Sequence, residues 1–322
     1  MTPLRIAVMG CASVAKRMVL PAMQKTDAIE LVAVASRTLA KAEEFAAEFG
    51  CEAVEGYDTI LERDDIDAIY MPLPTGMHAE WAERTLKAGK HLFIEKSLAM
   101  NAAEAEAMID LARQQKLAVR ENYMFEYHPQ QDTVRAAIGE QAGTVRLFRA
   151  SFGFPPLPDG NFRYDVGLGG GALLDAGGYV LKAMKVFFPG ATVRILSSSL
   201  TNGPSGADIS GAVMAEITDG DIVIPAHLAF GFDHHYQCGI EVWGSQAKIS
   251  TNRTFTAGPA VTPKMVIETA GGASEVELPQ DDHFKVILEA FAASVREQDF
   301  EPDYDAILTQ ARLQAEVRSS AS

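Results

Sequence analysis

The sequence predicts an α/β protein of two domains, and three observations lead to this prediction. The chain has 322 residues, more than one hydrophobic core usually serves. Apolar strand-like runs alternate with helical stretches up to about residue 122. Beyond that point short strands follow one another with polar turns between them, which favours an antiparallel sheet. We therefore expect domains at residues 1–122 and 123–322.

The first domain is expected to hold a parallel sheet covered by helices on both faces, because strand and helix alternate strictly. Its strands are predicted at residues 4–9, 29–35, 68–71, 92–94 and 117–119. Its helices are predicted at residues 13–25, 40–49, 78–87 and 102–115.

The second domain is expected to be built on a large, mostly antiparallel open sheet with helices. Strands are predicted at residues 145–152, 212–217, 222–230, 239–243, 247–251 and 265–269. Polar turns such as Thr218-Asp219-Gly220-Asp221 separate them. Two long helices, at residues 284–297 and 304–318, are predicted to finish the chain.

Composition narrows the class of function. The formal net charge of −15 argues against general affinity for nucleic acid, which needs lysine and arginine to displace counterions. The three cysteines show no CxxC spacing, as in proteins of a reducing compartment. The first strand begins at residue 4, which leaves no room for a signal peptide, and no apolar run is long enough to span a membrane. We expect a cytoplasmic protein with no membrane partner.

The first strand runs into a degenerate dinucleotide-binding fingerprint, Gly10-Cys11-Ala12-Ser13-Val14-Ala15. Gly10 allows the tight turn, and the small Ala12 lets a diphosphate approach the backbone. The following helix would then point its amino end at the phosphates. On this motif alone, a tight strand-to-helix turn without a ligand remains the alternative.

The end of the second strand predicts which cofactor binds. A cofactor without a 2′-phosphate usually meets an acidic residue there, about twenty residues after the fingerprint. This chain instead offers Ser36, Arg37 and Thr38, with Lys41 one turn later. Hydroxyl, guanidinium and ammonium groups suit a phosphate dianion. The sequence therefore predicts NADP(H) rather than NAD(H).

Lys96, Asp175 and Tyr179 are the candidate catalytic residues. Lys96 follows an apolar strand, and Asp175 lies four residues before Tyr179, one turn away on the same face of a helix. Hydride delivery to a ketone builds negative charge on its oxygen, so a proton donor must lie in reach. A nearby ammonium favours phenolate over phenol. We assign Tyr179 as the general acid in reduction, Lys96 as its electrostatic partner and Asp175 as an orienting group.

Several motifs together resemble the glucose–fructose oxidoreductase / inositol dehydrogenase (Gfo/Idh/MocA) superfamily, over essentially the whole chain. They are the degenerate fingerprint, Met71-Pro72-Leu73-Pro74 followed by His78, Glu95-Lys96, and Gly169-Gly170-Gly171-Ala172-Leu173-Leu174-Asp175 followed by Tyr179. The resemblance implies an N-terminal Rossmann domain, and a C-terminal sheet that often forms a homo-oligomer interface, in a dimer or tetramer. It also implies that Pro72, Leu73, His78, Glu95 and Lys96 line the cofactor site, where Lys96 could hold the nicotinamide ribose. A structural role for His78 is the alternative.

Shorter segments resemble one branch, the NADP-dependent C-3 ketoreductases of nucleotide-linked deoxysugars. They are residues 122–125, 128–130, 150–152, Arg163-Tyr164 and 252–256. The resemblance implies a substrate site that includes Asn122, His128, Arg163, Tyr164, Asp175 and Arg253. The guanidinium forks of Arg163 and Arg253 match phosphate oxygens, so either could bind a diphosphate. The alternative is that both residues are ordinary surface arginines that bind no ligand.

One position departs from the family pattern, because Glu95-Lys96 is followed by Ser97 where the family has proline. X–Pro bonds can be cis, whereas a cis bond before serine is costly. Either a trans bond presents the lysine or the loop is strained, so the placement of Lys96 stays open.

These patterns predict an NADPH-dependent reductase of a keto group on a sugar, expected to be nucleotide-linked. One alternative is an NADP-dependent dehydrogenase of a free sugar or of a trans-dihydrodiol. Another is a sensor that binds NADP(H) without turnover. No metal is expected, since the adjacent histidines His234 and His235 would point to opposite faces of a strand.

Overall fold

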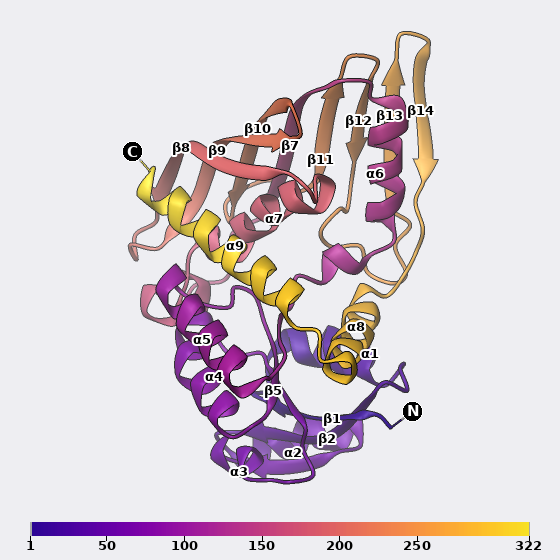
Figure 1. Ribbon diagram of the computed structural model, residues 1–322. Coiled ribbons are helices and arrows are strands. Elements are labelled where there is room, and N and C mark those ends of the chain that lie inside the picture. The colour runs from indigo at the N-terminus through magenta and orange to yellow at the C-terminus, as the bar shows by residue number, and fades with distance from the viewer. Residues whose placement is uncertain (1, 322) are drawn as a thin grey trace. The chain divides into compact units, whose positions relative to one another are not determined.

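The computed structural model describes residues 2–321, which form two compact units (Figure 1). Unit 1 comprises the described residues up to Met124 together with Phe284–Ala311. Unit 2 comprises Phe125–His283 and the described residues from Arg312 onward. The expected division at residues 1–122 and 123–322 differs at one segment, since the contacts of Phe284–Ala311 are with unit 1.

Unit 1 contains a six-stranded parallel sheet in the order β3-β2-β1-β4-β5-β6. Its strands are β1 Leu4–Met9, β2 Ile29–Ser36, β3 Glu52–Glu55, β4 Ala68–Met71, β5 His91–Ile94 and β6 Val119–Glu121. The strand order reverses at β1, so the carboxyl ends of β1 and β4 flank the crevice where such sheets bind ligands. The predicted parallel sheet is confirmed.

The helices of unit 1 follow the predicted series closely. They are η1 Ala15–Val19, α1 Leu20–Met23, α2 Leu39–Phe49, α3 Asp58–Leu61, η2 Thr75–Met77, α4 His78–Lys87, α5 Ala102–Gln115 and α8 His283–Glu297. One difference is that η1 is a π-type turn rather than α-helix. Another is that β6 begins two residues later than predicted. Lys116 ends α5 in the left-handed conformation and the Leu117 amide donates to the Ala112 carbonyl, so Leu117 completes the helix cap.

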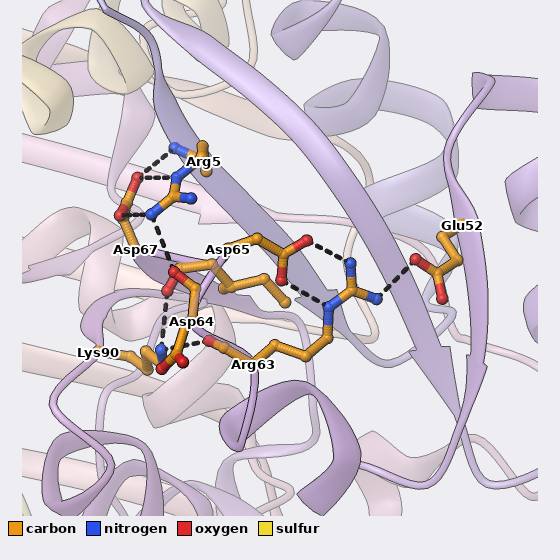
Figure 2. A network of polar contacts seen from close by, with 8 residues as sticks. Arg5, Glu52, Arg63, Asp64, Asp65, Asp67 and Lys90 are labelled. Atoms are coloured by element: carbon orange, nitrogen blue, oxygen red, sulfur yellow. Dashed lines mark hydrogen bonds and ion pairs between the residues drawn. The ribbon is translucent and has the colours of Figure 1, made fainter.

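A polar network holds the amino-terminal edge of this sheet (Figure 2). Arg5 of β1 donates to both carboxylate oxygens of Asp67, at 2.9 and 2.6 Å. Arg63 pairs with Asp65 and with Glu52 of β3. The Arg63 guanidinium lowers the pKa of the Asp65 carboxyl to about 2. These pairs lie where β1 and β4 begin, so they leave the carboxyl-terminal edge to the candidate site.

Unit 2 contains an eight-stranded sheet in the order β14-β13-β12-β11-β7-β10-β9-β8. Only β7 and β10 pair in parallel, so the predicted mostly antiparallel sheet is confirmed. The strands are β7 Val145–Gly153, β8 Thr192–Asn202, β9 Asp208–Asp219, β10 Ile222–Gly231, β11 Gln237–Gly244, β12 Ala247–Thr251, β13 Lys264–Thr269 and β14 Gly272–Glu277.

Helix α7 packs against one face of this sheet. The ring of Phe148 in β7 contacts the rings of Phe187 and Phe188 at the carboxyl end of α7, at centroid distances of 6.1 and 5.6 Å. The helices of unit 2 are η3 Met124–Tyr127, α6 Gln130–Gln141, η4 Phe162–Tyr164, η5 Val166–Leu168, η6 Leu173–Gly177 and α7 Gly178–Phe187. Helix α9, Glu301–Ser319, is shared by the two units. Among the described residues, no helix combines the length and apolarity needed to cross a membrane.

A buried histidine pair in unit 2 predicts acid sensitivity. His128 and His283 meet edge to face at 5.5 Å. Burial, with the neighbouring His128, lowers the pKa of His283 to about 3, against about 6.5 for a free histidine. Below about pH 6.5 the unfolded chain binds a proton at His283 that the folded chain does not bind. The free energy of unfolding therefore decreases as the pH is lowered.

We expect the free energy of unfolding to drop by about 2 kcal/mol between pH 7 and pH 5 through His283 alone. Urea unfolding of His283→Gln should show a shallower pH slope than the wild type. His227→Gln, at an exposed position of β10, should keep the wild-type slope. An unchanged slope in His283→Gln would contradict the prediction.

Candidate active site

The turn after β1 is built as the fingerprint predicts. Gly10 has φ +116°, and a Cβ atom there would lie 2.8 Å from Leu73 Cδ2, so only glycine fits without displacing that side chain. The Gly10 amide donates to the Ala35 carbonyl at the end of β2. The rest of the fingerprint, Cys11, Ala12, Ser13 and Val14, forms the turn and the first helical residues.

The basic end of β2 lies open beside this turn. Ser36 is buried, whereas Arg37, Thr38 and Lys41 are exposed. Neither Arg37 nor Lys41 forms an ion pair with any residue from 2 to 321. Two exposed cations outside any ion pair among residues 2–321, next to a turn that opens a helix, fit the 2′-phosphate and diphosphate of NADP(H).

Glu95, the residue before Lys96, has its carboxylate fixed by two hydrogen bonds. Glu95 Oε1 accepts hydrogen bonds from the Tyr70 hydroxyl and from Asn122 Nδ2, both at 2.7 Å. Burial raises the pKa of Glu95, while the two hydrogen bonds and the charge of Lys96 oppose that shift. Glu95 is thus fixed by Tyr70 of β4 and by Asn122, the residue after β6, which restrains the backbone next to Lys96.

The segment on the carboxyl side of Lys96 is held by His78. The Lys96–Ser97 peptide bond is cis. Nδ1 of His78 lies 3.0 Å from the Ser97 carbonyl oxygen and 3.1 Å from that of Leu98, and Nε2 lies 2.8 Å from that of Leu73. Burial lowers the pKa of His78, against the pull of these carbonyls. His78 is predicted at the cofactor, with a structural role as the alternative. Both ring nitrogens face backbone carbonyl oxygens, and whichever nitrogen carries the proton donates to one of them, which favours the structural role.

Tyr179 lies in the first turn of α7, directly after the π-type turn η6. Its side chain is buried, with 5% of the residue exposed, among the rings of Phe125, Phe152 and Phe255. The centroid distances to these rings are 5.7, 5.0 and 5.8 Å. Aromatic contacts on several sides leave the phenol ring little freedom to turn.

Asp175 lies in η6 and forms an ion pair with Arg163. Arg163 Nε donates to Asp175 Oδ2 at 2.6 Å, and 16% of the aspartate side chain is exposed. Gly177 of the same turn lets η6 approach the sheet, because a Cβ atom there would lie 3.1 Å from the Phe230 ring of β10. Asp175 and Tyr179 are thus carried on one helix that is held closely to the sheet.

Comparison with known proteins identifies the family. Residues 4–123 match the model described as oxidoreductase family, NAD-binding Rossmann fold, and residues 132–250 match the GFO/IDH/MocA C-terminal domain. The chain belongs to the GFO/IDH/MocA oxidoreductase family. The resemblance seen in the sequence is therefore confirmed, as is the predicted fold class.

Known proteins are similar to this chain over nine-tenths of its length or more. A dTDP-3,4-didehydro-2,6-dideoxy-alpha-D-glucose 3-reductase from Saccharopolyspora spinosa is 46% identical over 91% of this chain and 88% of its own. An enzyme of the same name from Actinomadura kijaniata is 38% identical over 99% and 96%. The crystal structure of a 3-ketoreductase from Actinomadura kijaniata in complex with NADP and TDP-benzene has a TM-score of 0.95, at 38% identity over 99% and 98%. Variants of that ketoreductase with a tyrosine changed to phenylalanine or a lysine to alanine or glutamate also match.

The residues expected to bind substrate occupy different places in the structure. Asn122 is buried in unit 1 against Glu95, and His128 is buried in unit 2 with its Nδ1 accepting from the Gln130 amide. The Tyr164 hydroxyl accepts from the Leu157 amide at 3.0 Å and closes the loop that carries Arg163. These three side chains are engaged within the protein itself.

Arg253 lies in the turn after β12, at the edge of a shallow cavity of about 320 Å³. Its guanidinium stacks on the Tyr236 ring at 4.8 Å and donates to the Tyr236 hydroxyl at 3.0 Å. The cavity is also lined by Ser151, whose neighbour Phe152 packs on Tyr179. Adjacent strand residues point to opposite faces, so the cavity opens on the sheet face away from Tyr179.

Within residues 2–321, no three histidine, cysteine, aspartate or glutamate side chains are grouped so that they could hold a metal ion.

Sequence reasoning missed Tyr70, the residue that fixes Glu95 from β4. A signal existed, because a buried tyrosine hydroxyl in an apolar strand needs a hydrogen-bond partner. The identity of that partner depends on the pairing of β4 with β5, which the sequence alone does not specify.

Proposed function

We propose that the protein reduces a keto group on a nucleotide-linked deoxysugar at C-3, with NADPH as reductant. The observation that carries this proposal is the 46% identity to a dTDP-sugar 3-reductase over 91% of the chain. Lys96, Asp175 and Tyr179 all support it, because they supply the groups that carbonyl reduction needs.

The turn Gly10–Val14 and the cations Arg37 and Lys41 would hold the diphosphate and 2′-phosphate of NADP(H). Ser36 and Thr38 add hydroxyl donors, and Pro72, Leu73 and Glu95 come from the neighbouring strand ends. When bound, NADPH supplies the hydride.

The chain's own part in the reaction is to manage the proton. Tyr179 would donate its phenolic proton to the carbonyl oxygen of the sugar as negative charge grows there. The ammonium of Lys96 would stabilise that charge by Coulomb attraction. Asp175, fixed by Arg163, would orient a sugar hydroxyl or the lysine.

The proposal is tested by following NADPH oxidation spectrophotometrically with a dTDP-linked 3-keto-2,6-dideoxysugar. We expect turnover with NADPH and a much poorer kcat/KM with NADH, because Arg37 and Lys41 favour the 2′-phosphate. Turnover of free sugars or trans-dihydrodiols, but not of the dTDP-sugar, would favour the dehydrogenase alternative. Absence of turnover with every carbonyl substrate, despite tight NADPH binding, would favour a sensor.

We propose Arg253, in preference to Arg163, as the side chain that binds the diphosphate of the substrate. The guanidinium of Arg163 is engaged with Asp175, whereas Arg253 forms no ion pair with residues 2–321. The turn that carries Arg253 leaves the cavity side of the sheet and continues to Phe255, which contacts the Tyr179 ring on the other side. Because two residues span about 7 Å at most, Arg253 lies near the strand end where the two sides of the sheet meet.

Arg253→Ala should therefore raise the dissociation constant of dTDP by roughly 10- to 100-fold, as expected for loss of charged hydrogen bonds. Isothermal titration calorimetry measures this constant. Arg149→Ala serves as the control, because Arg149 lines the same cavity but pairs with Glu241. Wild-type affinity in Arg253→Ala would rule out this assignment.

We further propose that the protein is a cytoplasmic homo-oligomer assembled through the sheet of unit 2. Large apolar side chains of this sheet are exposed, namely Leu196, Met214, Val223 and Trp243 at 41%, 50%, 54% and 43%. The cytoplasmic location is supported by the three cysteines of the protein, which are free thiols as in reducing compartments. Light scattering after size-exclusion chromatography would measure the subunit number.

A further inference from the structure

The helix that carries Asp175 and Tyr179 begins without a side-chain cap from its own sequence. Its π-type first turn, η6, follows Ala172, which offers no hydrogen-bonding side chain. The first amides of a helix have no partner within the helix, so something else must accept their hydrogen bonds.

Asp208, the first residue of β9, supplies that acceptor from 35 residues further along the chain. Its Oδ2 accepts from the Leu173 amide at 2.6 Å, and the Ala172 amide also donates to it. A negative charge at the amino end of a helix is favourable for its dipole as well.

The glycines before the helix make this approach possible. Gly171 has φ +129°, and a Cβ atom there would lie 2.4 Å from Asp208 Oδ1. A Cβ atom at Gly170 would lie 2.5 Å from the Arg163 carbonyl oxygen. The glycine-rich motif therefore leaves room on one side for the carboxylate and on the other for the loop that carries Arg163.

The protonation state of Asp208 matters for this contact. Burial raises the pKa of Asp208, while the amide hydrogen bonds and the charge of Arg318 from α9 oppose that shift. Only the ionised carboxylate accepts on both oxygens without restriction, so protonation would weaken the cap.

We propose that Asp208 is a positioning residue of the reaction, which fixes the start of η6 and thereby places Asp175 and Tyr179. This inference rests on the proposed function. A displacement of about 1 Å in a reacting group can cost roughly 100-fold in rate, so a loosened helix start should be visible in kcat.

The test compares Asp208→Ala and Asp208→Asn with the wild type in kcat, KM and NADPH affinity from pH 5 to 9. We expect kcat to fall roughly 10- to 100-fold in Asp208→Ala and less in Asp208→Asn, with NADPH affinity unchanged. Protonation of Asp208 should contribute to any acid-side loss of kcat in the wild type, so Asp208→Asn should show a smaller acid-side loss than the wild type.

A matched control is Asp303→Asn, which removes a carboxylate that accepts from Arg120 at 2.7 Å in unit 1. It should lower thermal stability while leaving kcat and its pH profile as in the wild type. If both Asp208 variants are less stable but keep the wild-type kcat, as expected for Asp303→Asn, the positioning role is overturned. The same holds if Asp208→Asn keeps the full acid-side loss of the wild type.

Hydrogen exchange at the Leu173 amide separates this inference from the proposed function. The amide should exchange at least 10-fold faster in Asp208→Ala than in the wild type, whatever the substrate turns out to be. Fast exchange with no turnover of keto-sugars in the wild type would refute the function but retain the cap. Unchanged exchange would refute the cap itself.

Discussion

Replacing Tyr179 with phenylalanine is expected to lower kcat by roughly 10²- to 10⁴-fold, because the variant has no phenolic proton for the sugar oxygen. The ring itself should stay in place. It packs against Phe125, Phe152 and Phe255, and phenylalanine preserves these contacts. The fall should therefore appear in kcat, and the KM for the sugar should change little.

Steady-state kinetics with NADPH and a dTDP-linked keto-sugar measures this effect. NADPH affinity by fluorescence titration and thermal unfolding should both match the wild type, since the cofactor turn belongs to unit 1. Tyr164→Phe is a suitable control, because its hydroxyl only closes the loop to Leu157. Turnover within threefold or so of wild type in Tyr179→Phe would show that another group supplies the proton.

Replacing Lys96 with alanine should lower kcat by roughly 10²-fold or more, because a fixed positive charge near the developing alkoxide is lost. The backbone around it is held independently of the lysine side chain. Glu95 is fixed by Tyr70 and Asn122, and the segment after it by His78. The loss should thus reflect missing charge rather than a displaced loop.

Lys96→Arg separates charge from shape, since it keeps the charge on a larger planar group. We expect it to recover part of the lost kcat. Lys87→Ala, which removes an exposed lysine paired with Glu83 on α4, should leave kcat unchanged. Equal losses in Lys96→Ala and Lys96→Arg would point to shape rather than charge.

The elements that the sequence predicted well are those with strong local signals. β4 and the helices α4 and α5 were predicted with the bounds they have in the structure. A short apolar run between polar residues, or an amphipathic run with an Asn cap such as Asn101 before α5, marks its own ends.

The elements that were not anticipated lack such signals. β8 contains three consecutive serines, Ser197–Ser199, and lies at one end of its sheet, so it need not be apolar on both faces. α6 begins after Pro129 with two glutamines, Gln130 and Gln131, whose side chains reach backbone carbonyls across unit 2. Tertiary contacts rather than periodicity fix these segments.

The residues of the candidate site also fall into those that local sequence signals mark and those that only tertiary contacts bring together. Residues marked by motifs, such as Gly10, Lys96 and Tyr179, could be proposed for the site from the sequence. Partners brought in by sheet pairing, such as Tyr70 and Asp208, could not. The motif residues His128 and Asn122 are predicted at the substrate, and their side chains are buried within their own units, a direction that the sequence motif does not give.

The π-type turn before α7 sets the rotational phase of the tyrosine. Each residue of a helix advances by about 100° around the axis, and a π turn holds one residue more than an α turn. If Leu173–Gly177 kept all their residues but closed as regular α-helix, each residue would advance further around the axis than it does in the π turn. Tyr179 would then turn by roughly a quarter of a revolution relative to Asp208 and Arg163, away from its three aromatic neighbours. Deleting one residue from the turn at the same time would restore the direction of Tyr179. The direction of this ring therefore depends on how many residues the turn before it holds.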